Sequence, residues 1–322
     1  MRIQRTQRSD WLTRALETLP FTFVSGSPVS SHRMTEQGSV TLRAIAHFPP
    51  DHPPPSEREA RRSWLPPHYI TMQVFICVQL SDFSSVESFI PRADSNLLNF
   101  YQLLTRCSSA PVALLAFEDK KDPSEGTEAF KVTDRGLGLK NTLIQPAEYA
   151  QLLNARRAPP EARNPEVKAI NRSLNDLFQW WTRSFLSPQL AINDVDAVYG
   201  LSRSSQGTKP VLFELKRSGV REWLPYLDDI PNFFLLQALS RDIGQARDLI
   251  LRYEDSVPNV LDIFSIERAS REAIVGYTIR VVGQTSEEVL RQTLSIAHSM
   301  DAGAQIPGGE PYISAKSRIR RF

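Results

Sequence analysis

The sequence has few cysteines, and its histidines form no cluster at metal-ligand spacing. Among its 322 residues only Cys77 and Cys107 are cysteines, and the five histidines form no group at metal-ligand spacing. A zinc site built on cysteine ligands is therefore not supported. Such sparse cysteine use is typical of the reduced interior of a cell, with a single disulfide as the alternative.

Long apolar runs and a strong net charge are also missing. No stretch approaches the roughly 18 uninterrupted apolar residues of a membrane span, and residues 1–20 have basic side chains without an apolar signal-peptide core. The 38 Lys and Arg and 36 Asp and Glu give a net charge of only +2, so any basic surface must be local. We expect a soluble cytoplasmic protein that has no membrane partner.

Proline, at 23 residues, outnumbers glycine, at 14. Many prolines fall in residues 48–69, which we expect to form a stiff loop or linker. A second proline-containing break, "RAPPEARNP", begins at Arg157. We therefore expect two domains: an N-terminal region over residues 1–157, serving target binding or assembly, and a catalytic domain over residues 158–322.

Apolar periodicity predicts alternating helices and strands in both regions. In the first region we expect helices over 10–19, 95–106 and 145–157, and strands over 69–80, 110–118 and within 128–140. In the second we expect helices over 165–187, from Pro231 within 226–254, and over 286–300, with strands over 192–200, 210–218, 259–268 and 272–283. This order predicts an α/β (α+β) fold around a mixed central sheet flanked by helices.

Two of these strands carry charges where a buried strand would be apolar. Because residues i and i+2 of a strand share a face, Glu214 and Lys216 lie side by side, and so do Asp194 and Asp196. Carboxylates on neighbouring strands supply the oxygen ligands that Mg²⁺ prefers, and Mn²⁺ can take its place. A lysine beside the metal orients or helps to deprotonate the attacking water and stabilises developing charge. Periodicity does not choose between the two aspartates.

The stretch "DAVY", the polar connection containing "SRSSQGTK" and the strand "VLFELKRS" together resemble the core motif of the PD-(D/E)xK nuclease superfamily. The resemblance implies a restriction-endonuclease-like fold and Mg²⁺-dependent hydrolysis of DNA. It implies that Asp196 and Glu214 bind the metal, that Lys216 is the catalytic lysine and that Asp194 is a supporting or alternative ligand. The family's proline before the aspartate is absent, because Val195 stands there.

Within that superfamily, a type II restriction or related defence endonuclease fits best, because no helicase or ATPase motif accompanies the core. By analogy it would act on double-stranded DNA as a homodimer. Three alternatives stay open: a repair or recombination nuclease, a catalytically silent DNA-binding relative, or a structural ion pair on a solvated sheet face. The upstream helix offers Glu166 or Asp176 as a further acidic ligand.

Basic and aromatic side chains after Lys216 are candidates for DNA contacts. The candidates are Arg217, Arg221, Trp223, Tyr226, Gln237 and Arg241. The alternative interpretation is that Trp223 and Tyr226 cover the core beside Phe233 and Phe234 and that the arginines are merely solvated. The basic tail over residues 314–322 would add a salt-sensitive phosphate contact.

Overall fold

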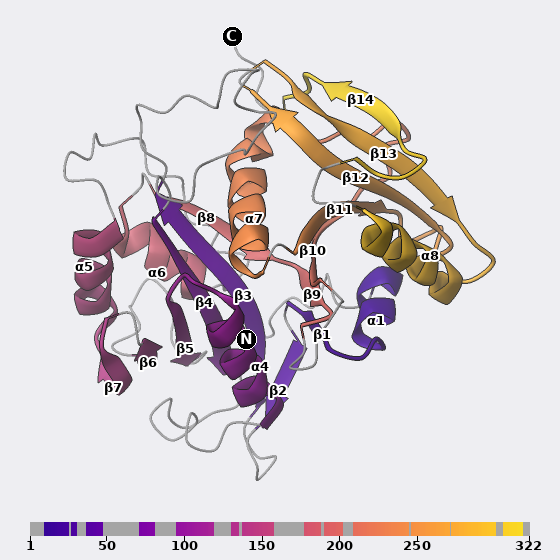
Figure 1. Ribbon diagram of the computed structural model, residues 1–322. Coiled ribbons are helices and arrows are strands. Elements are labelled where there is room, and N and C mark those ends of the chain that lie inside the picture. Colours follow the sequence, from indigo (N-terminus) through magenta and orange to yellow (C-terminus); the bar gives the residue numbers. More distant parts are fainter. Residues whose placement is uncertain are drawn as a thin grey trace. The chain divides into compact units, whose positions relative to one another are not determined.

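The described part of the chain forms two compact units, each built on a mixed sheet (Figure 1). The computed structural model describes residues 10–25, 27–30, 37–47, 71–80, 95–118, 130–134, 137–157, 177–187, 190–201, 209–244, 246–270, 272–300 and 305–317. Mixed sheets with helices in both units confirm the expected α/β (α+β) class. The proline-rich segment 48–69 lies outside the described residues.

The units alternate along the chain. The second unit takes an early segment that ends at Val24, the first unit contains the described residues from Ser25 to Asp194, and the second unit resumes at Val195. The expected boundary between residues 157 and 158 stays a prediction about independent domains.

The first unit is a sheet in the order β2-β3-β4-β5-β6-β7, with β8 also paired to β3. The β4–β5 pairing is parallel, and the β2–β3, β3–β4, β5–β6 and β6–β7 pairings are antiparallel. Its strands are β2 (Ser27–Ser30), β3 (Gln37–His47), β4 (Thr71–Leu80), β5 (Val112–Glu118), β6 (Phe130–Asp134), β7 (Leu139–Ile144) and β8 (Leu190–Val195). Its helices are α4 (Ser95–Cys107), α5 (Pro146–Arg157) and α6 (Leu177–Phe185).

Aromatic packing fills the core of the first unit. Trp181 of α6 is fully buried, stacks on Tyr149 with ring centroids 5.7 Å apart, and donates its indole N–H to the Pro146 carbonyl at 2.9 Å. Phe75 of β4 contacts the same indole edge-on. The expected elements β4, α4, β5 and α5 are confirmed, and the described part of the helix expected over 165–187 is α6.

The second unit is a sheet in the order β1-β9-β10-β11-β12-β13-β14. Only the β10–β11 pairing is parallel, and α7 lies in the connection between these two strands. Its strands are β1 (Thr22–Val24), β9 (Ala197–Tyr199), β10 (Val211–Arg217), β11 (Arg247–Tyr253), β12 (Val260–Ala269), β13 (Ile274–Val282) and β14 (Glu310–Ser314). Its helices are α1 (Trp11–Glu17), the 3-10 turn η4 (Leu227–Asp229), α7 (Ile230–Asp242) and α8 (Ser286–Ser299).

Helices cover both faces of this second sheet. On one face α1 and α8 pack on alternate strand residues such as Phe213, Leu251 and Ile263. On the other face α7 packs on β10 and β11, and a second cluster forms around Trp223 and Phe264. Because strand side chains alternate, the face opposite Phe213 receives Glu214 and Lys216. These two charges therefore lie on the α7 side of the sheet.

One expected element is wrong. Residues 231–254 do not form a single helix, because α7 ends at Asp242 and residues 247–253 form β11. Gly244 adopts φ +68°, a left-handed conformation that is strained for other residues, and this ends the helix. Leu249, Leu251 and Tyr253 occupy every second position of β11, so their side chains share one face of the sheet. Arg252 is thus a strand residue. The strands β1, β2, β3 and β14 are not among those expected from the sequence.

The first helix of the second unit is fastened to the end of β11. Buried Asp10 caps α1 by accepting from the Thr13 N–H at 2.8 Å, and it also accepts from the Tyr253 hydroxyl at 2.6 Å. The Trp11 indole donates to the Glu254 carbonyl at 2.8 Å. Burial, then the bond to Asp10, raises the pKa of Tyr253, so the phenol stays a neutral donor. These contacts join segments 243 residues apart.

Asp10→Ala should lower the free energy of unfolding by about 2 kcal/mol, because it removes a helix cap and leaves a buried hydroxyl without an acceptor. Tyr253→Phe should cost only about 1 kcal/mol, since the cap survives. Urea unfolding measures both, with Glu17→Ala on the exposed side of α1 as control. Equal stability of the Asp10 and Glu17 variants would contradict this anchoring role.

Candidate active site

The structure separates the two aspartates that periodicity left equivalent. The strand expected over 192–200 is interrupted: β8 ends at Val195, β9 begins at Ala197, and the two belong to different sheets. Asp194 forms an ion pair with Arg43 inside the first unit. Asp196 accepts a hydrogen bond at 2.7 Å from the backbone N–H of Leu215, in β10. Asp196 is thus the aspartate that lies beside the strand carrying Glu214 and Lys216.

Glu214 and Lys216 form a buried ion pair that also faces Asp229. Lys216 Nζ donates to Glu214 Oε1 at 2.7 Å and lies 3.9 Å from Asp229 Oδ2. The side chains of Glu214 and Lys216 are 9% and 19% exposed, and Asp229 is likewise buried. Asp229 stands directly before α7, the helix that covers this face. Sequence reasoning gave Asp229 no role.

Lys216 is held in its charged form. Burial of the ammonium lowers its pKa, but the charge and hydrogen bond of Glu214 and the charges of Asp229 and Asp196 outweigh burial, so the net shift is upward. Lys216 is therefore an ammonium at neutral pH. This state suits the stabilisation of negative charge and the orientation of water better than the removal of a proton.

The alternative interpretation of these charges, a structural ion pair on a solvated sheet face, agrees only in part with the structure. An ion pair between Glu214 and Lys216 does form, but it is buried rather than solvated. A buried pair is weak support for stability, because desolvation of both charges offsets their attraction. Ionisable groups with shifted pKa values in a cluster of charges are candidates for a functional site, which keeps Lys216 and its partners under consideration.

Two of the expected metal ligands are carboxylates held near Lys216. Asp196 and Glu214 offer carboxylate oxygens from adjoining elements, and Mg²⁺ is commonly bound by one or two carboxylates while keeping several waters. Among the described residues no group of three or more His, Cys, Asp and Glu side chains is arranged to hold a metal. Glu166 and Asp176, the further acidic candidates, lie outside the described residues.

The expected DNA-contacting residues divide into buried and accessible side chains. Trp223 is 6% exposed and packs edge-on against Phe264 and Tyr226, as the core-covering alternative requires. Gln237 is 8% exposed and donates to the Ile266 carbonyl at 3.1 Å. Neither side chain is presented for stacking or base contact in this conformation.

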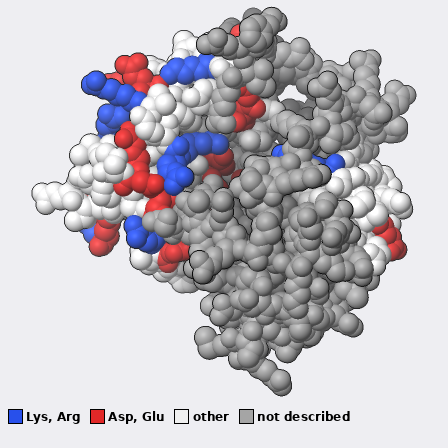
Figure 2. Space-filling view, turned by 180° about the vertical axis from the view of Figure 1, so that it is seen from behind, with Lys and Arg blue, Asp and Glu red and all other residues white. Residues whose placement is uncertain are grey.

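The accessible candidates are arginines. Arg221 is exposed, and Arg217 is about half exposed and pairs with Asp255 at 3.1 Å. Figure 2 shows acidic and basic side chains interspersed over the described surface of one face rather than gathered in one basic patch. DNA contact by these arginines stays a prediction. In the basic tail, residues 318–322 lie outside the described part.

Arg241, at the end of α7, lies near Asp248 at the start of β11. Burial lowers the pKa of Arg241, and the charge of Asp248 opposes this. Burial also raises the pKa of Asp248 to about 6, against the opposing effects of Ser240 and Arg241. Asp248 is half-buried by its exposed area, so water screens part of this effect. Arg241 is thus partly committed to an internal contact.

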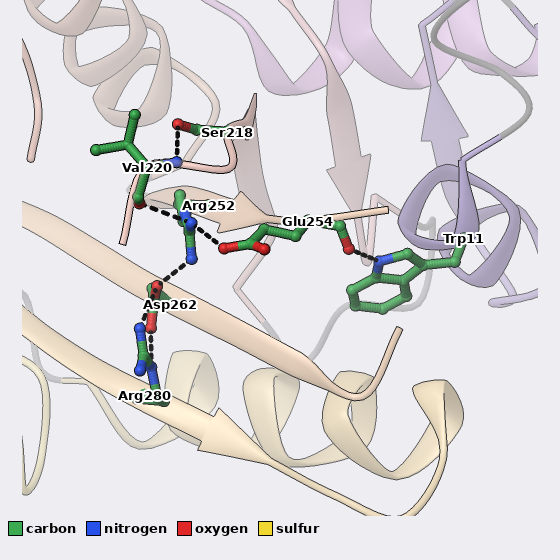
Figure 3. A network of polar contacts seen from close by, with 7 residues as sticks. All are labelled: Trp11, Ser218, Val220, Arg252, Glu254, Asp262 and Arg280. Atoms are coloured by element: carbon green, nitrogen blue, oxygen red, sulfur yellow. Dashed lines mark hydrogen bonds and ion pairs between the residues drawn. The ribbon is translucent and has the colours of Figure 1, made fainter. Parts of the chain in front are cut away.

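A row of charged residues crosses neighbouring strands beside the candidate site, and Figure 3 shows the contacts of Arg252, Asp262 and Arg280 within it. The sheet register aligns Lys216 with Arg252, Arg252 with Asp262, and Asp262 with Arg280. Arg252, only 4% exposed, pairs with Asp262 at 3.0 Å and with Glu254, and donates to the Val220 carbonyl at 2.8 Å. Through Val220 this row holds the segment that follows Lys216.

Comparison with known proteins gives no assignment. No protein-family model matches the chain, and no curated protein matches it in sequence. Within the described ranges no helix is long and apolar enough to cross a membrane. The function is therefore argued from the geometry of the site.

Asp262→Asn should lower the free energy of unfolding by about 2 kcal/mol, because the buried Arg252 guanidinium loses one of its two carboxylate partners and keeps only Glu254. Arg280→Gln is the matched control, since that guanidinium is 54% exposed; the control should cost under about 1 kcal/mol. Urea unfolding compares the two variants. If both variants lose less than about 1 kcal/mol of unfolding free energy, the pairing of Arg252 with Asp262 contributes little.

The raised pKa of Asp248 predicts that the stability of the protein depends on pH. Its pKa is higher in the folded state, about 6, than the ordinary value of 3.8, so the folded protein binds the proton more tightly and loses stability as pH rises between these values. Asp248→Asn should therefore be more stable than the wild type by about 1–2 kcal/mol at pH 7 and equal to it near pH 4. Urea unfolding at both pH values tests this; a difference independent of pH would contradict it.

Proposed function

We propose that this protein is a Mg²⁺-dependent DNA endonuclease that hydrolyses phosphodiester bonds, related to the PD-(D/E)xK nucleases. The observation that carries the proposal is the Glu214–Lys216 pair on β10, with Asp196 bound to the Leu215 N–H between them and its charge acting on Lys216. A largely buried lysine beside carboxylates suits chemistry on an anionic substrate.

The fold around the site supports this proposal. β10 lies between antiparallel β9 and parallel β11, and α7 covers the face that carries Glu214 and Lys216. This is the mixed, helix-flanked central sheet that the sequence resemblance implies. Under this proposal the motif runs from Asp196 to Lys216, and α7 covers the face that carries Glu214 and Lys216.

The site residues have separate tasks in this mechanism. Asp196 and Glu214 would hold a Mg²⁺ ion, which when bound supplies a Lewis acid and an activated water. Asp196 is oriented by the Leu215 N–H, so its carboxylate is fixed on the backbone of β10. Lys216, kept as an ammonium, orients the water and stabilises the negative charge that develops on the phosphate oxygens.

As the biological setting we propose a type II restriction or related defence enzyme that acts in the cytoplasm on double-stranded DNA. A homodimer would place two active sites on the two strands of a palindromic site. A repair or recombination nuclease would use the same chemistry. A catalytically silent DNA-binding relative is the rival of a different class, and cleavage assays separate it from the nuclease.

Lys216→Ala and Glu214→Gln should each lower Mg²⁺-dependent plasmid cleavage at least about 100-fold, because each removes a group that acts on the transition state or holds the metal. EDTA should abolish cleavage by the wild type. The measurement is conversion of supercoiled plasmid to nicked and linear forms, with single-stranded, branched and methylated DNA as further substrates.

Matched controls are available on exposed positions. Lys209→Ala, just before β10, and Glu267→Gln, on β12, change the same residue types where the side chains are exposed. Both should cut like the wild type. If the wild type is as inert as the Lys216 and Glu214 variants on every substrate, the silent binding module replaces the nuclease.

A further inference from the structure

Lys216 lies between two carboxylates, of which one would also be needed by a metal. Its Nζ donates to Glu214 Oε1 at 2.7 Å and lies 3.9 Å from Asp229 Oδ2. Glu214 would have to serve the ammonium and Mg²⁺ at once. A metal at Glu214 therefore competes with Lys216 unless another anion takes over the ammonium.

We propose that Asp229 is a positioning residue that holds the Lys216 ammonium when Glu214 binds the metal. The proposal rests on the nuclease function above and deepens it. Asp229 makes no capping bond to α7 within the described residues, although it occupies the N-cap position. Its carboxylate instead faces Lys216 from the helix side, while Glu214 faces Lys216 from the same strand.

The backbone around Asp229 is fixed from the far end of the chain. The Asp229 N–H donates to the Tyr226 carbonyl at 3.0 Å, and the Leu227 N–H donates to the Lys316 carbonyl at 2.8 Å. Buried Ser314 donates its hydroxyl to the Pro225 carbonyl at 2.6 Å. The end of β14 thus holds the segment before α7 in place, so Asp229 is a preorganised acceptor rather than a mobile surface carboxylate.

The chain also contains a matched control. Asp228, the neighbour of Asp229, carries the same charge but accepts from the Ser317 hydroxyl at 2.9 and 3.0 Å. Asp228→Asn and Asp229→Asn therefore change the net charge equally at adjacent positions. Any difference between them reports the position of the carboxylate rather than the loss of a charge.

The first test measures Mg²⁺ affinity by titration calorimetry without DNA. Asp229→Asn should weaken binding about tenfold, since Glu214 then has to satisfy both cations, whereas Asp228→Asn should change it less than about twofold. In a Lys216→Met background Asp229→Asn should have no further effect, because the ammonium is gone.

The outcomes separate this inference from the proposed function. If the wild type binds no Mg²⁺ and cuts no DNA, the nuclease proposal fails. If the wild type does both but the two asparagine variants bind Mg²⁺ alike, only the role of Asp229 fails. A tenfold loss that persists in the Lys216→Met background would make Asp229 a direct metal ligand and would also overturn the inference.

The second test is kinetic. Asp229→Asn should lower kcat about tenfold or more for plasmid cleavage with KM for DNA unchanged, and Asp229→Glu should recover part of the loss by restoring the charge. A change in KM alone, or no recovery by Asp229→Glu, would contradict a positioning role. Circular dichroism and urea unfolding of each variant identify losses that arise from misfolding.

Discussion

The candidate site is organised around the ion pair between Glu214 and Lys216 on β10, an interior strand of the second sheet. Glu214 and Lys216 occupy adjacent positions on one face of β10, between β9 on one side and β11 on the other, with α7 above them. Apolar residues at these two positions would pack at lower cost, because neither charge would lose its hydration. The surrounding structure offsets part of this lost hydration. Asp229 adds a second anion near the ammonium, and Asp196 accepts a hydrogen bond from the Leu215 N–H, which lies on the backbone between Glu214 and Lys216.

The elements far from this pair fix its surroundings. Arg252 stands beside Lys216 on β11 and ties Asp262 and the Val220 carbonyl together, so the segment after β10 has a defined path. Further along the same segment, Ser314 of β14 donates to the Pro225 carbonyl, and the Leu227 N–H donates to the Lys316 carbonyl just after β14. On the opposite face the contacts of Asp10 and Trp11 fasten α1 to the end of β11. Residues from the first helix and from the C-terminal segment thus support the surroundings of the candidate site.

Residue patterns along the chain were enough to predict part of the fold and part of the candidate site. The period of two placed Glu214 and Lys216 together, and apolar periodicity located β4, α4 and α5, because each depends on neighbours along the chain. Non-local facts were missed. The run before Tyr253 was assigned to a helix because its apolar residues fit either period, although Gly244 is a signal for the helix end. Asp229 has an ordinary explanation as a residue before a helix, and only the return of the chain to β10 brings it to Lys216. The two aspartates differ because the chain passes from one unit to the other between them, which no periodicity records.

The central claim is that Asp196 and Glu214 share one metal ion beside Lys216. The most direct measurement is a crystal structure of the protein soaked in Mn²⁺, with anomalous scattering used to locate the ion. We expect an anomalous peak within coordination distance of both carboxylates, with Lys216 still in the site. A fully occupied Mn²⁺ elsewhere, with the Glu214–Lys216 pair intact and no peak between the two carboxylates, would contradict the claim.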